Sequence, residues 1–207
     1  MTATAILLDT PSTGPWCDVI ANPSEVRDLE EAQLSRAAST GDPAAFSALL
    51  RRFQQPVFGL CYRLLGERES AADATQESFV RAYAALASFD PGQRFDLWLL
   101  RIARNHCYDV LRRRGVRPEV DEEAAALAVD GAPTALERLE EAETGRHLEA
   151  ALQTLPAQDR EVLALYYVQR KKTREIAQVM GVAPGTVMAR LFRAREKLRK
   201  NLVEVAP

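Results

Sequence analysis

The chain has 207 residues, 47% of them hydrophobic and 27% charged, a composition typical of a globular protein that can bury a core. Its formal net charge at pH 7 is −2. No apolar run approaches the roughly 18 residues of a membrane-spanning helix, and the N-terminus lacks the basic start and long apolar stretch of a secretion signal. We therefore expect a cytoplasmic protein without direct membrane insertion.

The cysteine and histidine residues favour neither a disulfide framework nor a metal site. Cys17, Cys61 and Cys107 are odd in number, far apart and without a CxxC pair. His106 and His147 have no partners at metal-ligand spacing. The sequence also lacks a glycine-rich phosphate loop and a nucleophile–base motif. We expect no cofactor, no metal and no enzymatic activity.

Charge is distributed unevenly along the chain. Residues 46–117 hold twelve arginines against seven acidic residues, a balance of +5. Residues 119–149 hold ten acidic residues against two arginines, a balance of −8, and residues 156–207 hold eleven lysines and arginines against five acids, +6. Solvated surfaces that offset one another are one interpretation. The placement favours another, two nucleic-acid-facing modules with an acidic connector.

The first expected elements are a flexible arm and a helix. Residues 1–27 contain several proline and glycine residues among Thr, Ser and Asp, which is typical of an unstructured arm. A helix should run from near Ser24 to Ser39. The Gly-Asp-Pro of residues 41–43 should end it, and Asp42 can cap the next helix.

Residues 44–65 have the pattern of an amphipathic helix. Apolar residues recur at steps of three and four, which predicts a face turned to the core. Pro56 should kink or split this helix, and Gly66 should end it. The apolar face comprises Phe46, Leu49, Leu50, Phe53, Val57, Leu60 and Leu64.

A further helix is expected over residues 70–87, and it carries a polar stripe. The stripe is either a solvated face or a docking surface for a helical partner, and composition does not choose between them. It comprises Asp73, Gln76, Glu77 and Arg81, beside Phe79, Val80 and Tyr83.

After a Pro-Gly loop at residues 88–94, a helix from Asp96 to about Arg114 carries a basic face. Such a face with Tyr and Asn suits single-stranded nucleic acid, because Arg binds phosphates, Tyr stacks on a base and Asn reads a base edge. Alternatively, the cations favour the helix C-terminus and stay in water. The face comprises Arg101, Arg104, Asn105, Tyr108 and Arg112. Trp98 is either a core or interface anchor, which is the more common role, or a wedge between bases.

Residues 116–134 combine prolines, a glycine, acids and alanines and should form a linker. Helices should follow over residues 135–154 and 157–169, separated by a Leu-Pro break.

Residues 173–200 have the pattern of a helix-turn-helix. Thr173 can cap a short helix, Gly181 can end it, and Pro184 fits the first turn of a second helix. A second helix of this kind lies in the major groove, with its N-terminal residues at base edges and its cations near phosphates. A helical hairpin with a solvated basic face is the alternative. The expected apolar face comprises Val187, Leu191, Ala194 and Leu198, and Arg190, Arg193, Lys197 and Lys200 should lie mostly away from it.

The expected fold is therefore all-α, with two small helical domains joined by an acidic flexible linker and a helix-turn-helix as the C-terminal domain. We assign residues 1–27 to the arm, 28–115 to the first domain, 116–134 to the linker and 135–207 to the second domain.

Four segments, in this order, resemble a known family. They are QESFVRAY (residues 76–83), WLLRIARN (98–105), LPAQDREVL (155–163) and GTVMARLFRAR (185–195). The chain resembles the bacterial extracytoplasmic-function sigma factors, the small two-domain class of transcription initiation subunits, over roughly residues 44–202. The resemblance implies a protein that binds core RNA polymerase, directs it to promoters and helps to open the DNA.

The resemblance also implies a role for each segment. The first would dock on the clamp helices of the largest polymerase subunit, and the second domain would reach the polymerase flap. The loop at residues 89–95 and the helix after it would open the minus-ten element and capture a flipped base. The helix from Pro184 would read the minus-thirty-five element. The acidic linker would thread toward the polymerase active site and RNA exit path, and an anti-sigma factor would be a further partner.

The implied contact residues fall into three sets. Those for core polymerase are Asp73, Gln76, Glu77, Phe79 and Val80. Those for minus-ten DNA are Phe89, Arg94, Trp98, Arg101, Arg104, Asn105, Tyr108 and Arg112. Those for minus-thirty-five DNA are Arg174, Pro184, Gly185, Thr186, Arg190, Arg193 and Arg195.

The chain departs from the family pattern at five positions. Ala74 and Thr75 stand where bulky apolar residues usually precede Gln-Glu. Met188 and Ala189 stand where Lys and Ser commonly follow Gly-Thr-Val, and Ala183 is a poor helix cap where Ser is common. The reading helix thereby loses polar groups, so its contacts should depend on its arginines and backbone amides.

Two other classes of protein explain fewer of these features. A stand-alone helix-turn-helix regulator would use the C-terminal domain alone, often as a dimer, and leaves the polar stripe and the basic face without a purpose. A helical scaffold leaves both basic segments unexplained. The sequence therefore predicts a non-enzymatic sigma factor whose partners are core polymerase, promoter DNA and an anti-sigma factor.

Overall fold

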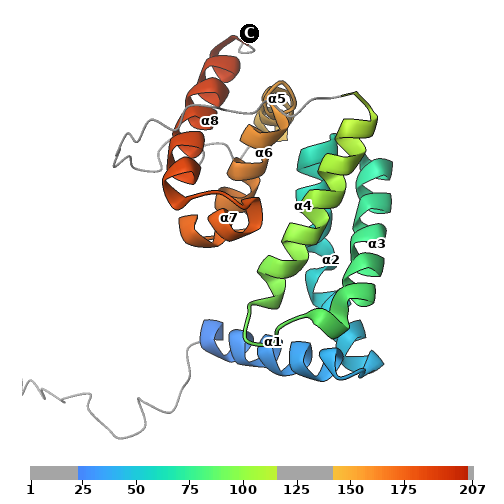
Figure 1. The fold of residues 1–207 in the computed structure, drawn as a ribbon. Helices are drawn as coiled ribbons and strands as arrows, with labels where there is room; N and C mark the ends of the chain where they lie inside the picture. Colours follow the sequence, from blue (N-terminus) through green and yellow to red (C-terminus); the bar gives the residue numbers. More distant parts are fainter. Residues whose placement is uncertain (1–22, 116–141, 205–207) are drawn as a thin grey trace, which may run out of the picture.

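A computed structural model describes residues 23–115 and 142–204, and every regular element in these ranges is helical (Figure 1). The N-terminal part contains α1 (Pro23–Ser39), α2 (Pro43–Leu65), α3 (Arg68–Ala85), the short 3-10 turn η1 (Leu86–Ser88) and α4 (Phe95–Arg113). The C-terminal part contains α5 (Ala142–Gln153), α6 (Ala157–Leu163), the π-helical turn η2 (Ala164–Val168), α7 (Thr173–Met180) and α8 (Pro184–Glu204).

Helices α2, α3 and α4 pack side by side, and α1 crosses one end of them (Figure 1). The predicted apolar face of α2 is buried apart from Leu50, which is half-buried. The predicted start and end of α2 are also confirmed. The Asp42 carboxylate accepts hydrogen bonds from the N–H groups of Ala44 (2.8 Å) and Ala45 (3.2 Å). Gly66 ends the helix at φ +77°, a conformation that suits glycine.

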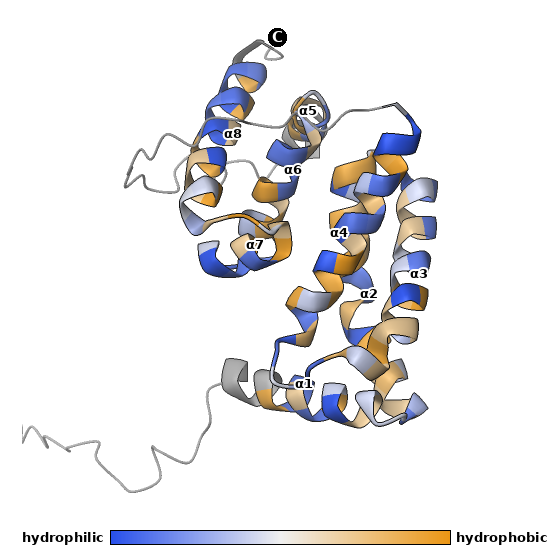
Figure 2. Cartoon of the chain, viewed as in Figure 1, coloured by the Kyte–Doolittle hydropathy of each residue, from blue (hydrophilic) through white to orange (hydrophobic). Residues whose placement is uncertain are grey.

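The C-terminal part contains the predicted helix-turn-helix. Gly181 turns the chain at φ +68°, and its N–H donates to the Ala177 carbonyl at 2.9 Å. The predicted apolar residues of α8, from Val187 to Leu198, are all buried. In both parts the hydrophobic faces of the helices are turned toward neighbouring helices and the hydrophilic faces outward (Figure 2).

Three local predictions need correction. Pro56 does not split its helix, because α2 runs from Pro43 to Leu65 with buried residues, such as Phe53 and Val57, on both sides of the proline. The helix expected over residues 157–169 widens into η2, where the Gln169 N–H reaches back five residues to the Ala164 carbonyl at 3.0 Å.

The start of α7 also differs from the prediction. Thr173 is the first helical residue, and the cap precedes it: the Lys172 N–H donates to the Glu175 carboxylate at 2.7 Å. The predicted arm up to residue 22, the linker at 116–134 and the first turns of the helix expected from residue 135 lie outside the described residues.

The two parts pack directly against each other. Helices α6 and α7 lie against α2 and α4, on the side of α4 away from α3 (Figure 1). This arrangement decides which of the predicted contact residues reach the surface.

Within residues 23–115 and 142–204, no helix is both long and apolar enough to cross a membrane.

Candidate nucleic-acid interface and docking groove

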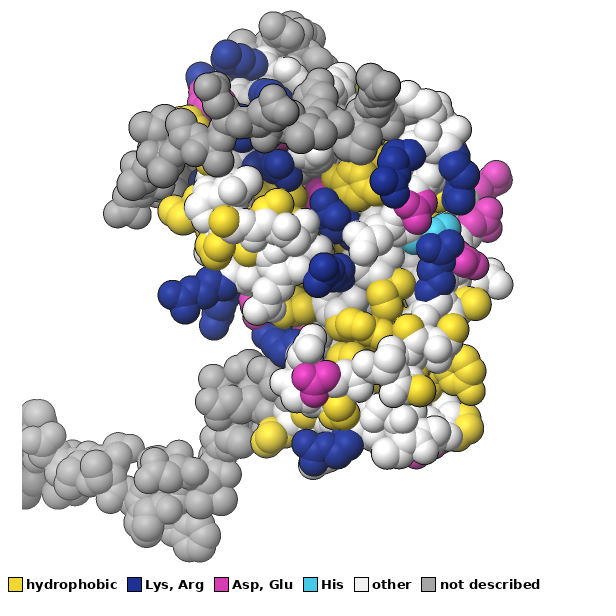
Figure 3. Space-filling view, in the orientation of Figure 1, with side chains coloured by type: hydrophobic (Ala, Val, Ile, Leu, Met, Phe, Trp, Pro, Cys, Tyr) yellow, Lys and Arg dark blue, Asp and Glu magenta, His cyan; other side chains and the backbone are white. Residues whose placement is uncertain are grey.

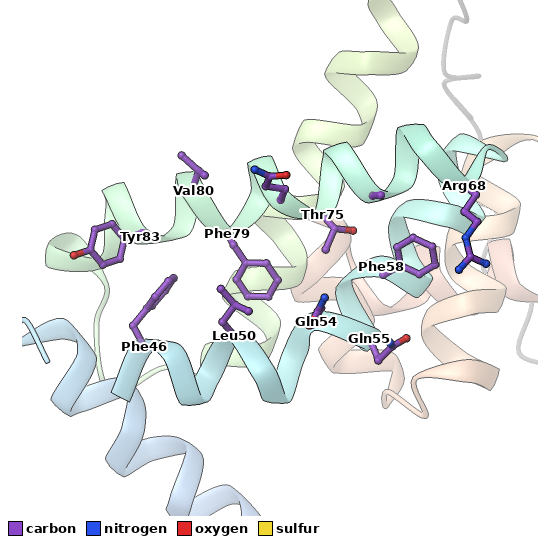
Figure 4. Close-up of a pocket in the computed structure, with 12 residues that line it drawn as sticks. Phe46, Leu50, Gln54, Gln55, Phe58, Arg68, Thr75, Phe79, Val80 and Tyr83 are labelled. Atoms are coloured by element: carbon purple, nitrogen blue, oxygen red, sulfur yellow. The ribbon is translucent and has the colours of Figure 1, made fainter. Parts of the chain in front are cut away.

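A groove of about 840 Å³ runs between α2 and α3 (Figure 4). Phe46, Leu50 and Phe58 line it from α2, and Phe79 and Val80 are among its residues from α3. Val80 is 57% exposed, although it is apolar. An exposed apolar surface with polar neighbours is typical of a site for another protein.

The groove brings together three of the five residues predicted to dock on polymerase. Gln76, Phe79 and Val80 line it, whereas Asp73 and Glu77 do not. They separate because each residue turns an α-helix by about 100°, which places Asp73 and Glu77 farther around α3 from Phe79 than Gln76 and Val80 are.

Glu77 points instead toward the edge that α3 shares with α4. It forms an ion pair with Arg81 at 2.7 Å, and this hydrogen bond holds the pKa of Glu77 below its ordinary value. Arg81 also lies 3.8 Å from the carboxylate of Asp109 on α4.

Ala74 and Thr75, which depart from the family pattern before Gln-Glu, are both buried where helices pack. Ala74 is 2% exposed, and Thr75 is 6% exposed and donates its hydroxyl to the Ala71 carbonyl at 2.6 Å. Thr75 also lines the groove. A smaller side chain at position 75 therefore leaves the groove wider, rather than removing an exposed contact.

Four aromatic rings join the loop after η1 to the first turn of α4. The ring centroid of Phe95 lies 5.8 Å from that of Phe53, 5.5 Å from that of Phe89 and 5.5 Å from that of Trp98. Phe89 and Phe95 are buried and Trp98 is half-buried. The buried ring of Phe89 attaches the loop to the core, and Trp98 is the most exposed ring of Phe89, Phe95 and Trp98.

The predicted basic face of α4 divides into two groups. Arg101, Asn105 and Arg112 are exposed, and Arg112 pairs with Asp109. Arg104 and Tyr108 are not exposed, because both bind Glu161 of α6. Figure 3 shows lysine and arginine side chains gathered over α4 and where it meets the C-terminal helices.

Glu161 is fully buried between the two parts of the chain. Its carboxylate accepts hydrogen bonds from Nε of Arg104 at 2.5 Å and from the hydroxyl of Tyr108 at 2.7 Å. Burial raises the pKa of Glu161, and Arg104 and Tyr108 act in the opposite direction. Burial and then the nearby Glu161 raise the pKa of Tyr108.

A second charged group lies where the start of α4 meets α7. Arg94 donates to Asp96 through Nη2 at 2.8 Å and also binds Glu175. Lys171 binds the same Asp96 carboxylate. Burial alone would raise the pKa of Asp96, but Lys171 and Arg94 outweigh it, so the pKa lies below its ordinary value.

The predicted minus-thirty-five residues spread over α7 and α8. Arg174, Pro184 and Gly185 are exposed, and Thr186 and Arg193 are half-buried. The guanidinium of Arg195 lies 5.3 Å from the ring centroid of Tyr166 and 5.4 Å from that of Tyr167. Met188 is 46% exposed near the start of the reading helix.

Arg190 corrects one expectation. It was expected to lie away from the apolar face, yet only 6% of it is exposed. Burial raises the pKa of both Glu161 and Tyr108, and the positive charge of Arg190 lies close enough to both to act against that rise. Its burial follows from the packing of α8 on α6 and α7, which spacing along one helix does not reveal.

Sequence reasoning missed the residues that join the two parts. Asp96 was assigned only to a helix start, and Glu161, Lys171 and Glu175 were given no role. Glu161 did carry a signal, since this carboxylate directly precedes the apolar run from Val162 to Leu165. Among the described residues, no cluster of His, Cys, Asp or Glu could hold a metal ion.

Comparison with known proteins finds a matching family model for each of the two parts of the chain. Residues 49–117 match the model of Sigma-70 region 2, and residues 146–198 match that of Sigma-70 region 4. The chain is 34% identical over 173 residues to the ECF RNA polymerase sigma factor SigW of Bacillus subtilis, over 78% of this chain and 91% of that protein. It is 35% identical over 181 residues to the RNA polymerase sigma-H factor of Pseudomonas aeruginosa, over 84% and 94% of the two chains.

Two solved structures share the fold. One is CnrH in complex with the cytosolic domain of CnrY, with a TM-score of 0.62 and 28% identity over 84% of this chain and 98% of that one. The other is the sigma factor RpoE in complex with the anti-sigma factor NepR from Bartonella quintana, with a TM-score of 0.58 and 26% identity over 78% and 98% of the chains.

Proposed function

Because this chain belongs to the extracytoplasmic-function family of RNA polymerase sigma factors, we propose a division of its work among three surfaces. As a sigma factor it binds core polymerase and gives it promoter recognition. The groove between α2 and α3 docks on polymerase, the exposed face of α4 contacts minus-ten DNA, and the start of α8 contacts minus-thirty-five DNA. The first two lie in the domain of residues 28–115, and the third lies in that of residues 135–207.

One observation supports the docking assignment: Gln76, Phe79 and Val80 meet in a groove of mixed apolar and polar lining, to which the C-terminal helices contribute no residue. We assign the clamp helices of the largest polymerase subunit to this groove and the polymerase flap to the C-terminal domain. The polymerase supplies all the chemistry, and the protein acts in the cytoplasm, where polymerase and DNA are found.

The direct test is co-purification with core polymerase, followed by transcription from a supercoiled promoter library. The chain should form a stable complex with core and should select a restricted set of start sites. A protein that binds duplex DNA as a dimer, without polymerase, would instead support a stand-alone regulator.

An anti-sigma factor is a further proposed partner. The solved relative RpoE is bound to the anti-sigma factor NepR. In the present chain, Val80 and Tyr83 on α3 are 57% and 59% exposed and offer an apolar surface for such a protein.

Asn105→Ala is expected to impair promoter opening more than initial binding. Asn105 is an exposed amide beside Arg104 on α4, where it can read the edge of an unpaired base. The loss of such a contact should cost about 1–3 kcal/mol of open-complex stability. Permanganate reactivity of thymines in the bubble measures this, with Gln33→Ala on α1 as an exposed amide control. Unchanged reactivity in Asn105→Ala would remove Asn105 from the melting surface.

Arg193→Ala is expected to weaken promoter binding about equally across minus-thirty-five variants and to lower the salt slope by about one. The physical reason is that a phosphate contact carries little sequence information. Arg190 lies nearer the start of α8 but is only 6% exposed in the free chain, so a base contact requires it to leave Glu161 and Tyr108 in the holoenzyme. With that contact made, Arg190→Ala should relax discrimination at one base position by ~1–3 kcal/mol. Holoenzyme binding to single-base promoter variants at two salt concentrations separates the two roles. An unchanged ranking of variants in both proteins would make α8 a phosphate clamp only.

A further inference from the structure

The exposed face at the start of α8 is apolar. Over its first two turns the exposed residues are Pro184, Gly185 and Met188, and none of them carries a side chain that can form a strong hydrogen bond. Thr186 is half-buried, and Arg190 is only 6% exposed. The part of this helix that would enter a DNA groove therefore offers few side-chain donors and acceptors to base edges.

Met188 lies near the middle of this exposed face. Its neighbours four residues before and after, Pro184 and Phe192, are also exposed, and residues at this spacing share one face of a helix. Val187, the residue directly before it, is fully buried. The side chain of Met188 is thus directed away from the helices packed on α8 and leaves apolar surface in water, with 46% of the residue exposed.

The rest of α8 is strongly basic. After Met188 the helix carries six lysine and arginine residues against two glutamates. Such a helix attracts the phosphates that border a DNA groove, whereas a protein seated over Met188 would have to pair the same cations with acidic groups. Residues 146–198, which match Sigma-70 region 4, include Met188. The charge of α8 and the continuity of this face with the proposed upstream surface favour DNA as the partner of the apolar face.

The four bases differ in whether they offer an apolar group to such a face. In the major groove thymine alone presents a methyl group, at C5, and the other groups on the base edges are donors and acceptors. A thioether placed against a donor or acceptor would remove water from it without giving a strong hydrogen bond in return. Against the thymine methyl group, both apolar surfaces leave water. The flexible, unbranched side chain of methionine can adjust to make this contact.

We propose that Met188 is a specificity-determining residue that recognises the C5 methyl group of a thymine in the minus-thirty-five element. The inference rests on the proposed role of α8 as the reader of that element. It adds a base preference that arises from an apolar contact and not from the arginines of the helix. The removal of one methyl group from water corresponds to about a fourfold gain in affinity.

The experiment removes this methyl group from the DNA. In a promoter obtained from the transcription library, each thymine of the minus-thirty-five element, on either strand, is replaced singly by deoxyuridine, which lacks only the C5 methyl group. Holoenzyme made from core polymerase and the full chain should bind one of these duplexes about fourfold more weakly than the unaltered promoter. Holoenzyme with Met188→Ala should bind the two duplexes equally. Because both proteins meet the same duplexes, any effect of deoxyuridine on the DNA itself cancels.

Two further variants at the same position test whether the contact is apolar. Met188→Gln keeps a side chain of similar length but makes it polar, and should lose the sensitivity to deoxyuridine. Met188→Leu remains apolar and should keep it. Val168→Ala is the control, because Val168 is an apolar residue of the same domain that is 62% exposed and lies outside α8. The control should show the same fourfold difference as the unaltered chain, and circular dichroism checks that each variant keeps its helices.

The outcomes separate this inference from the proposed function. If other base changes in the element weaken binding but every deoxyuridine is silent, α8 remains the reader and the role of Met188 is wrong. A fourfold difference that persists in Met188→Ala would assign the methyl contact to another residue. If Met188→Ala weakens binding to core polymerase without DNA and leaves the thymine preference unchanged, the apolar face is a protein contact. If no base change in the element alters binding, the upstream role of α8 and this inference fail together.

Discussion

Phe95→Ala is expected to lower the free energy of unfolding by about 3–5 kcal/mol, the range for removing a buried aromatic ring. Phe95 is 1% exposed, and its ring lies at the centre of the cluster with Phe53, Phe89 and Trp98. Its loss leaves a cavity where the loop of residues 89–94 is attached to the start of α4. The same substitution should therefore also impair promoter opening.

Urea denaturation of the full chain, followed by circular dichroism, measures the change in stability. Leu29→Ala is the control, because Leu29 is 62% exposed and should alter stability by no more than about 0.5 kcal/mol. A loss below about 1 kcal/mol in Phe95→Ala would mean that the aromatic cluster does not anchor α4.

Val80→Asp is expected to weaken core polymerase binding roughly thirtyfold or more while leaving the fold intact. Val80 is already 57% exposed, so a carboxylate there remains in water in the free protein. In a complex that covers the groove, the same carboxylate would be buried without a partner. An unpaired charge at an interface costs about 2–5 kcal/mol.

Equilibrium binding to purified core polymerase measures this effect, with Leu29→Asp as an equally exposed leucine-to-aspartate control on α1. Glu77→Lys should weaken binding by about one to a few kcal/mol, through a like-charge or unpaired contact. Wild-type affinity in Val80→Asp would show that polymerase does not use the groove. Wild-type affinity in Glu77→Lys alone would remove only Glu77 from the docking surface.

Features that depend on neighbours in sequence could be predicted well. The apolar stripe from Phe46 to Leu64, the Asp42 cap and the turns at Gly66 and Gly181 all appear in the structure where the pattern placed them. Each follows from helix periodicity or from the backbone of one residue, and neither requires knowledge of the rest of the fold. The four ordered segments likewise carried the family assignment, which the comparisons confirm.

Contacts that depend on how distant helices pack against each other could not be predicted from the sequence pattern. Periodicity shows that Arg190 lies on α8 near an apolar face, but it does not show that Tyr108 of α4 and Glu161 of α6 lie beside it. The hydrogen bonds from Arg104 and Tyr108 to Glu161 span 57 and 53 residues of sequence.

The sequence by itself determined most of the helices, the Asp42 cap and the family of this protein, because local spacing and short motifs are written within single segments. Only the tertiary structure decided which polar side chains are available. It placed Gln76, Phe79 and Val80 in one groove and left Glu77 on another face. It also gave Arg104 and Tyr108 a buried carboxylate as partner, because the charge that neutralises a side chain is chosen by the packing of distant helices and not by its neighbours along the chain.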